Sequence, residues 1–479
     1  MLNKTDPSII QSYLEDSSNL TGGSSDELVI PENDQEISKF FSDCNSNNVP
    51  ITMHGGGTGT TGGSIPFGGK ILSTEKLNKI INVDKAGMFA VVEPGATLAE
   101  IELAVKKVGL LYPPDPTEKN ATIGGNVATN ASGGRCFRFG STRDWIRRLK
   151  IILPNGNILN LKRKLITLDR KNQFDLPFAN ITMPSYKMPS IKNSAGYFNA
   201  PGMDFLDLFI GSEGTLCLIS EIELALRPAL AETFDLVTFF PAEKNAVDFV
   251  LESKRQKDGL INFYEFFDEN TLQMLKKSYP HIPDNAKAAI YVEQEVNESN
   301  AKTYLDNWGQ LLEKYNASLD NCWLGTDAKQ KEDLSKFRHA IPEHINEMFK
   351  QYHQVKLATD IAVPEDKFIE IFNFYVSELR THDSQLYSIK FGHIGDNHLH
   401  VNLIAKKEED LPLAKELIMR FVKKAVELGG TVSAEHGIGK IKHQYLKEMY
   451  GENGIKEMIN VKKVFDPNLI LGRNNIFTV

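Results

Sequence analysis

Three glycine-rich segments, at residues 54–63, 121–134 and 211–215, restrict what this chain can fold into. Glycine lacks a Cβ, so another group can approach the main chain closely where it is frequent. Successive backbone N–H groups in such a loop can also form a concave anion-binding site. The first segment therefore predicts a phosphate-binding loop, with a flexible surface loop as the alternative.

Two standard phosphate motifs do not fit the first segment. Residues 57–62 match the spacing G-x-G-x-x-G, and Asp84 follows at a tolerable distance for a ribose ligand. However, the dinucleotide fingerprint requires a helix to begin inside the loop, and residues 63–69, which include Pro66, do not favour one. The Walker pattern fails because Ile71 follows Gly69-Lys70. The loop is thus predicted to bind phosphate through its backbone.

The second glycine-rich segment follows a proline-rich one. Residues 112–117 contain three prolines, and residues 121–134 contain four glycines. The prolines make the first part of the backbone rigid, and the glycines let another group approach the second part closely. This combination is typical of one side of a binding site for a flat ligand.

Composition limits the class of protein. The chain has 479 residues, 41% hydrophobic and 24% charged, which is enough for two or three globular domains. Its net charge of −8, with mixed signs, argues against a general nucleic-acid binder. No apolar segment approaches the roughly 18 residues of a membrane span, and the N-terminal residues lack an apolar signal core. Four scattered cysteines indicate reduced thiols. We expect a cytoplasmic protein, with peripheral association at the inner membrane as an alternative.

Patterns along the chain predict four parts: an N-terminal helix (1–22), a first domain (23–228), a second domain (229–440) and a C-terminal segment (441–479) that returns to the first domain. In the first domain, Thr97 and Glu100 form a capping box that begins a helix. The second domain has helical patterns near 242–257, 298–314, 331–350, 364–381 and 412–428, with strands near 236–240 and 288–292. This alternation predicts an α+β domain with an antiparallel sheet.

Residues 391–402 concentrate polar side chains. His393 and His400 are seven positions apart and can converge only if the chain turns between them. Gly395-Asp396-Asn397 is suitable turn chemistry. His398, His400 and Asn402 then alternate with apolar residues, as in a half-buried strand. The pattern predicts a hairpin that is either a ligand-binding site or a surface with solvated histidines.

Glu435 and His436 form a second polar pair, within residues 431–440. In an extended backbone the two side chains point to opposite sides. One of them could therefore bind a metal ion while the other faces a substrate.

Together these features resemble the FAD-linked oxidase family with the vanillyl-alcohol-oxidase type of flavin domain, in particular its D-lactate dehydrogenases, D-2-hydroxyglutarate dehydrogenases and glycolate oxidase catalytic subunits. The resemblance runs from about residue 25 to the end. Seven segments carry it, in order: 54–63, 113–117, 121–131, 139–144, 211–215, 392–402 and 435–439. It implies a two-subdomain FAD-binding domain and an α+β substrate (cap) domain with an antiparallel sheet.

The resemblance also implies which residues contact FAD. Gly55, Gly56, Gly57, Thr58 and Gly59 would hold the pyrophosphate. The rest of the cofactor would contact Pro114, Gly124, Gly125, Asn126, Thr129, Asn130, Glu213, Gly214 and Ile219. Relatives with covalent flavin have a histidine at the position of Thr58, so noncovalent FAD is expected.

In the second domain the resemblance implies His393, His400 and Glu435 as ligands of a divalent metal. Zinc is the first choice, and manganese or iron would accept the same ligands. His436 would be the general base, Asn402 a substrate contact, and Arg338 the group that binds the substrate carboxylate. These residue types suit the oxidation of a 2-hydroxy acid, whose hydroxyl and carboxylate can chelate an open metal position while hydride passes to the flavin.

The chain departs from the family at three places. Asn397-His398 replaces the usual Gly-Asn, Ala434 replaces a common glycine, and residues 471–475 replace an Asn-Pro-Gly ending. His398 is thus an extra histidine without an assigned role. Pro342 and the neutral pair Ala358-Thr359 do not resemble contacts for a second carboxylate, which favours a small monocarboxylate such as D-lactate.

Other activities stay open at this point. The alternatives within the family are a D-2-hydroxyglutarate dehydrogenase and a glycolate oxidase subunit, and those outside it are a non-catalytic flavin-binding subunit and a metal-dependent hydrolase. The electron acceptor could be a quinone, a cytochrome, an electron-transfer flavoprotein or an iron–sulfur subunit. A homodimer is one assembly compatible with the sequence.

Overall fold

A computed structural model describes residues 1–479 except 170, 178, 231 and 256–259. The chain forms two compact units. Unit 1 comprises residues 1–132, 141–229 and 431–479, and unit 2 comprises residues 133–140 and 230–430.

The first sheet of unit 1 has four strands in the order β1 (Leu2–Lys4), β2 (Glu27–Ile30), β4 (Lys70–Ser73) and β3 (Ile51–His54). The β2, β4 and β3 strands are parallel, and β1 is antiparallel to β2. Helix α2 (Asp34–Ser46) begins at its cap Asn33 and buries residues spaced three and four apart, namely Ile37, Phe40, Phe41 and Cys44. This spacing places them on one face of the helix, where they share a core with the sheet.

The second sheet of unit 1 is antiparallel, in the order β5 (Ile80–Asp84), β6 (Phe89–Val92), β12 (Leu218–Ala225), β8 (Ile146–Ile152) and β9 (Ile158–Lys162). The predicted capping box of Thr97 and Glu100 is confirmed and begins α3 (Leu98–Lys106). The α4 helix is Ile123–Thr129. Two short pairs complete the strands: β7 (Leu110–Leu111) with β13 (Arg227–Pro228), and β10 (Gln173–Leu176) with β11 (Ala179–Thr182).

The N-terminal segment differs from the predicted helix over 1–22. The structure has a single α-helical turn, α1 (Pro7–Ile10), followed by a 3-10 turn over Gln11–Tyr13. Asp6 caps α1 and Pro7 occupies its first turn, so the helix cannot extend towards the N-terminus. The preceding residues instead form β1 against β2.

Unit 2 is built on one sheet of seven strands, in the order β17 (Trp323–Gly325), β14 (Glu232–Phe240), β16 (Ala288–Val296), β15 (Ile261–Asp268), β19 (Leu386–Gly392), β20 (His398–Ala405) and β18 (Ile361–Ala362). All neighbouring pairs are antiparallel. The predicted antiparallel α+β domain is thus confirmed.

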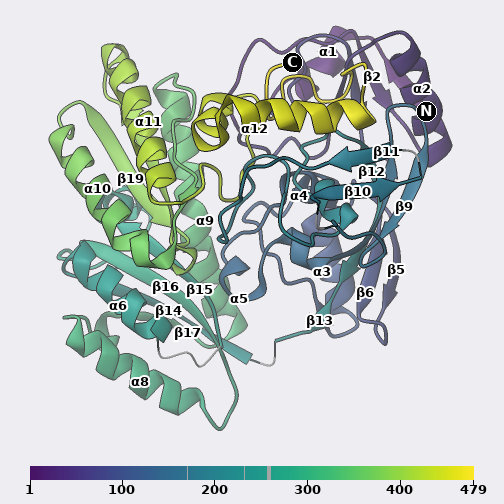
Figure 1. The fold of residues 1–479 in the computed structure, drawn as a ribbon. Coiled ribbons are helices and arrows are strands. Elements are labelled where there is room, and N and C mark those ends of the chain that lie inside the picture. Colours follow the sequence, from purple (N-terminus) through teal and green to yellow (C-terminus); the bar gives the residue numbers. More distant parts are fainter. Residues whose placement is uncertain (170, 178, 231, 256–259) are drawn as a thin grey trace. The chain divides into compact units, whose positions relative to one another are not determined.

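Helices pack on this sheet (Figure 1). They are α5 (Cys136–Phe139), α6 (Glu243–Arg255), α7 (Glu269–Leu275), α8 (Ala301–Lys314), α9 (Ala328–Gln351), α10 (Phe368–Thr381) and α11 (Leu411–Glu427). The α7 and α9 helices share a buried core with alternate residues of β14, β15 and β16. On the other alternate positions, Phe240 packs on Phe249 of α6 and Phe266 packs on Phe372 of α10. The sheet is therefore buried on both faces, as its apolar strands require.

Residues 431–440 lie with unit 1, although the sequence pattern places them in the second domain. Hydrogen bonds explain the difference: Glu213 accepts from the backbone of Ile438 and Gly439, and the Thr61 carbonyl accepts from the backbone of Lys440. The last helix, α12 (His443–Phe465), is interrupted at Gly451, whose φ is +66°. The positive φ, which glycine adopts without strain, divides α12 into two helical pieces.

Candidate functional site

The predicted hairpin is present in unit 2. Strand β19 ends at Gly392, a 3-10 turn spans Ile394–Asp396, and β20 begins at His398. Asn397 closes the turn in the left-handed region with φ of +54°, a conformation that asparagine tolerates better than most residues. The turn brings His393 to the start of β20.

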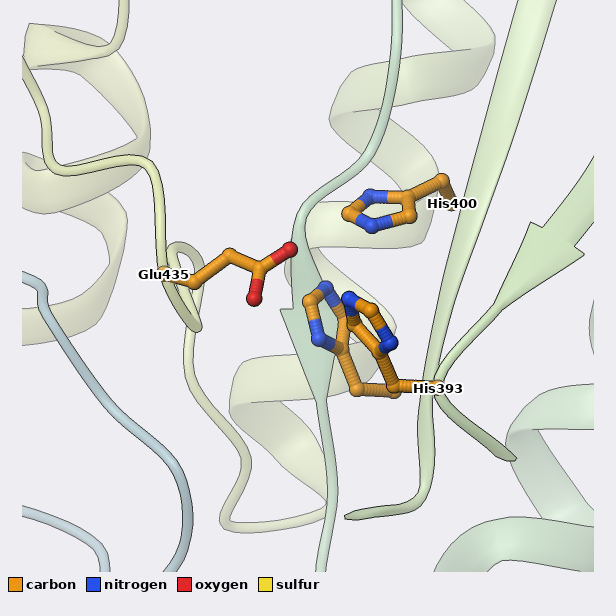
Figure 2. A group of neighbouring side chains, drawn as sticks. His393, His400 and Glu435 are labelled. Atoms are coloured by element: carbon orange, nitrogen blue, oxygen red, sulfur yellow. The ribbon is translucent and has the colours of Figure 1, made fainter. Parts of the chain in front are cut away.

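Three histidine side chains of the hairpin lie close together. The ring centroids of His393 and His400 are 5.6 Å apart (Figure 2). One ligand nitrogen from each of His393, His398 and His400 lies within 4.8 Å of the others. All three residues are buried, so the solvated-histidine alternative does not hold, and the donor set fits a divalent metal ion.

Acceptors on the ring nitrogens support this interpretation. The Nδ1 atom of His393 is 2.7 Å from Oε1 of Glu265, and Nδ1 of His400 is 3.4 Å from the Thr359 carbonyl oxygen. Metal-binding histidines commonly donate their second ring N–H to a carboxylate or a backbone carbonyl in this way. In both rings the Nε2 atom is then the one positioned to bind a metal ion.

Glu265 was not identified from the sequence. This residue lies in β15, and Oε1 also accepts a 2.7 Å hydrogen bond from Arg338. Burial alone would raise the pKa of Glu265, but Arg338 and His393 lower it to about 2. A carboxylate inside the apolar strand Ile261–Asp268 was the available signal, because buried acids are rare unless paired.

Arg338 lies on α9 and is 14% exposed. Its Nη2 atom donates to Glu265, which fixes the orientation of the planar guanidinium. Gly134 packs on the same pair: a Cβ there would lie 2.6 Å from Glu265 Oε1 and 3.3 Å from Arg338 Nη2. The end of the second glycine-rich segment thus allows close approach to this ion pair.

Asn402 lies two residues beyond His400 on β20 and is 1% exposed. Among the described residues, neither the nitrogen nor the oxygen of its side-chain amide has a hydrogen-bond partner. Burying an unsatisfied amide costs on the order of 1–3 kcal/mol. A bound ligand would satisfy it, which fits the predicted substrate contact.

Glu435 and His436 lie in unit 1. The Oε2 atom of Glu435 is 2.7 Å from Nζ of Lys192 and accepts a 3.1 Å hydrogen bond from Ser132. The Oε1 atom is 3.6 Å from Nε2 of His436. Lys192, only 3% exposed, is a second residue that the sequence analysis missed. Its ammonium group places a positive charge beside the Glu435 carboxylate.

Glu213 positions the same segment. Both of its carboxylate oxygens accept 2.7 Å hydrogen bonds, one from Ile438 and one from Gly439. Burial raises the pKa of Glu213 to about 7, although these two N–H groups oppose the rise. The predicted cofactor residue therefore anchors the segment that carries Glu435 and His436.

The first glycine-rich loop meets the second inside unit 1. A Cβ on Gly55 would lie 2.5 Å from Oγ1 of Thr122, and one on Gly56 would lie 3.0 Å from the Asn120 carbonyl oxygen. In the part of the chain that the structure describes, no backbone N–H of residues 56–61 donates to a protein acceptor. Backbone amides without a protein acceptor suit a pyrophosphate.

The α4 region has matching unsatisfied groups. Thr122 Oγ1 and Asn126 Nδ2 are buried, and neither has a hydrogen-bond partner among the described residues. Gly124 packs against Pro94, where a Cβ would lie 2.6 Å from the proline ring. These features fit a cofactor bound along the loop and the start of α4.

The remaining predicted cofactor residues differ in their surroundings. Thr129 donates to the Gly125 carbonyl, and Asn130 accepts from the backbone of Arg143. Ile219, in β12, and Pro114 are buried, and Gly214 adopts φ of +69°. In the first loop, Gly57 and Thr58 are partly exposed and Gly59 is exposed.

Comparison with known families identifies both halves of the chain. Residues 25–162 match the FAD binding domain, and residues 234–476 match the C-terminal domain of FAD linked oxidases. The chain belongs to the FAD-linked oxidase family. This confirms the resemblance seen in the sequence and assigns FAD and an FAD-dependent dehydrogenase activity class to the protein.

Curated relatives cover nearly the whole chain. A D-lactate dehydrogenase of Anaerostipes hadrus is 30% identical over 94% of this chain and 89% of its own length. A glycolate oxidase subunit GlcD of Bacillus subtilis is 29% identical with the same coverage. A D-2-hydroxyglutarate dehydrogenase of Xanthomonas citri is 26% identical over 99% of this chain and 94% of its own length.

Solved structures share the fold. A 4-ethylphenol oxidase from Gulosibacter chungangensis has a TM-score of 0.72 at 14% identity, covering 99% of this chain and 94% of that one. An alkyldihydroxyacetonephosphate synthase has a TM-score of 0.69 at 17% identity, covering 98% and 81%. The fold predicted from the sequence, with its vanillyl-alcohol-oxidase type of flavin domain, is confirmed. Within the described residues, no helix combines the length and apolar character that a membrane span requires.

Proposed function

We propose that this enzyme oxidises a D-2-hydroxy acid to the 2-oxo acid, with D-lactate or a similar small monocarboxylate as the substrate. Relatives named for D-lactate, D-2-hydroxyglutarate and glycolate support the class, because all three compounds are 2-hydroxy acids. The observation that carries the proposal is the hairpin, where buried imidazoles stand beside the unsatisfied amide of Asn402.

The proposal assigns His393, His400 and Glu435 as ligands of a divalent metal, with zinc as the first choice. Their chemistry fits: two imidazoles and a carboxylate leave an open position for a hydroxyl and a carboxylate oxygen. Such an ion would supply Lewis acidity that lowers the pKa of the substrate hydroxyl. Glu265 would hold the ligand His393 in a fixed orientation. Lys192 would do the same for the ligand Glu435.

The remaining chemistry falls to three residues of this chain. His436 accepts the hydroxyl proton as the general base, since imidazole titrates near neutral pH. Arg338, oriented by Glu265, binds the substrate carboxylate. The Asn402 amide hydrogen-bonds the substrate oxygens. Residues 55–59 and 122–130 would hold noncovalent FAD, which would supply a two-electron acceptor when bound.

A small monocarboxylate fits the residues near Asn402 better than a dicarboxylate does. Ala358 forms an isolated β-bridge with Asn402, and Thr359 follows it. Neither side chain is cationic, and Pro342 on α9 is uncharged as well. A second substrate carboxylate would have no matching positive charge at these three positions. Glycolate and D-2-hydroxyglutarate are the alternative substrates, and an assembly subunit without turnover is the alternative of another class.

We also propose a cytoplasmic protein, because its four cysteines are scattered without metal-ligand or redox spacing. The candidate electron acceptors are a quinone, a cytochrome, an electron-transfer flavoprotein and an iron–sulfur subunit. Binding of such a partner and homodimer formation are both compatible with the chain.

Anaerobic flavin reduction tests the proposed function. Purified protein should be yellow, and D-lactate should bleach its flavin absorbance faster than glycolate or D-2-hydroxyglutarate. Flavin reduction by L-lactate should be slow, and a chelator should lower the rate of flavin reduction by D-lactate. His436→Asn should slow reduction roughly 10²–10⁴-fold, the usual contribution of a general base.

The exposed His281 provides a matched control, since His281→Asn removes an imidazole away from the proposed site. This variant should reduce flavin at the wild-type rate. No bleaching by any D-2-hydroxy acid, with flavin and metal both present, would overturn the proposal. Turnover unchanged in His436→Asn would remove that residue from the mechanism.

A further inference from the structure

His398 is the third histidine of the hairpin and stands where the family has asparagine. Its side chain is fully buried, and its Nε2 atom lies 3.0 Å from Oδ1 of Asp360, which is also buried. The roles proposed above leave this pair unused.

The position of His398 suits metal binding. It shares a face of β20 with His400, and the two ring centroids are 4.5 Å apart. The centroid of His393 is 5.3 Å from that of His398. Two imidazole nitrogens bound tetrahedrally to one zinc ion at about 2.1 Å lie roughly 3.4 Å apart. One nitrogen from each of the three rings lies within 4.8 Å of the others, which is near that spacing.

The contacts of the three rings follow one pattern. His393 has the Glu265 carboxylate on one ring nitrogen, His398 has the Asp360 carboxylate, and His400 has a backbone carbonyl. An oxygen acceptor on the second nitrogen is the usual outer contact of a metal-binding histidine. Because Asp360 contacts Nε2, the coordinating atom of His398 would be Nδ1.

We propose that His398 is a third imidazole ligand, so that one hairpin of unit 2 supplies three neutral ligands and Asp360 positions one of them. The proposal rests on the metal site of the proposed function and extends it. A three-imidazole set favours zinc, cobalt or nickel over manganese, which prefers oxygen ligands. With three imidazoles on the ion, Glu435 would be a ligand that a substrate oxygen can replace, so a position stays open for the substrate and the ion should still bind when that carboxylate is removed.

The competing role for His398 is a buried structural pair with Asp360. Both roles predict that losing His398 destabilises the hairpin, so stability alone does not separate them. Ligation alone predicts that the chemistry of position 398 changes the spectrum of the bound ion.

Cobalt spectroscopy on the full-length, FAD-loaded protein separates the two roles. Metal-free protein is titrated with Co²⁺, and zinc-loaded spectra are subtracted so that flavin absorbance cancels. His398→Cys should introduce a thiolate-to-cobalt charge-transfer band that the wild type lacks. His398→Asn should weaken Co²⁺ binding by at least the 10–100-fold typical of outer contacts. Asp360→Asn should weaken it less, and Glu435→Gln should still bind Co²⁺.

His344→Asn is the matched control, because the Nδ1 atom of this α9 histidine contacts only the Ala340 carbonyl of its own helix in the described structure. It should bind Co²⁺ as the wild type does. Absence of the band in His398→Cys, together with wild-type affinity in His398→Asn, would overturn the proposal. If the His398 variants do not fold, X-ray absorption of the zinc-loaded wild type decides: three imidazoles support ligation, and two exclude it.

The outcome is distinguishable from failure of the proposed function. If D-lactate reduces the flavin but only two imidazoles bind the ion, His398 is not a ligand and the proposed function stands. The charge-transfer band without flavin reduction by any D-2-hydroxy acid would keep the ligand and remove the function.

Discussion

Single residues in this protein are fixed by buried ionic contacts. Glu265 orients both His393 and Arg338, and Lys192 holds Glu435. Glu213 anchors the segment at 437–439 through two backbone N–H groups. Each acid is buried with its partners, so its charge state is coupled to folding.

The raised pKa of Glu213 predicts that the stability of the folded chain depends on pH. Its pKa is raised by burial from 4.5 to about 7 in the folded chain. Between about pH 4.5 and pH 7, the Glu213 carboxyl therefore keeps its proton in the folded state and loses it in the unfolded state. The associated stability is fully present below about pH 4.5 and falls as the pH rises through 7, by roughly 3 kcal/mol in all.

Urea unfolding of wild type and Glu213→Gln at about pH 5 and about pH 8 measures this effect. The variant loses one backbone hydrogen bond at both pH values, so the difference between the two proteins is the readout. The wild type should lose stability relative to Glu213→Gln on going from the lower to the higher pH. An unchanged difference would show that Glu213 does not titrate in this window.

At the scale of elements, the hairpin of β19 and β20 depends on backbone conformations that few residues adopt. Gly392 has φ of +123°, and a Cβ there would lie 2.8 Å from Cδ2 of His400. Glycine at this position therefore permits both the turn and the orientation of the His400 ring.

Gly392→Ala should lower stability by about 1–3 kcal/mol and weaken metal binding, because the methyl group displaces the His400 ring and strains the backbone. Gly429→Ala is the control. Its φ is +74°, but a Cβ there would meet nothing within 4 Å, so it should lose stability without losing metal affinity. Thermal unfolding and Co²⁺ titration measure the two effects. Equal Co²⁺ affinity in both variants would contradict the prediction.

At the scale of the whole molecule, the core of unit 2 positions the polar residues. Phe337 is fully buried, next to Arg338 on α9. Its ring centroid lies 5.0 Å from those of Tyr279 and Trp323 and 5.5 Å from that of Phe267. Packing of α9 on the sheet thus sets where Arg338 meets Glu265.

Phe337→Ala should destabilise the protein by about 3–5 kcal/mol, because it leaves a cavity among three aromatic rings. Ile369→Ala, at a residue that is 40% exposed on α10, should change stability by less than about 0.5 kcal/mol. Urea unfolding followed by tryptophan fluorescence measures both. A loss below about 1 kcal/mol in Phe337→Ala would show that the cluster repacks.

The sequence by itself determined the elements whose signals are local. The Thr97 capping box, the turn at 395–397 and the alternation of β20 depend on neighbouring residues, so they could be predicted. Order and spacing of seven segments also identified the family and hence FAD.

Only the tertiary structure decided which groups surround those residues. Glu265 is 128 positions from His393, and Lys192 is more than 200 from Glu435, so no local pattern connects them. The same holds for Asp360 beside His398, and for the attachment of residues 431–440 to Glu213. Contacts of this kind follow from how strands and helices pack, because burial forces each charged group to find a partner wherever the fold supplies one.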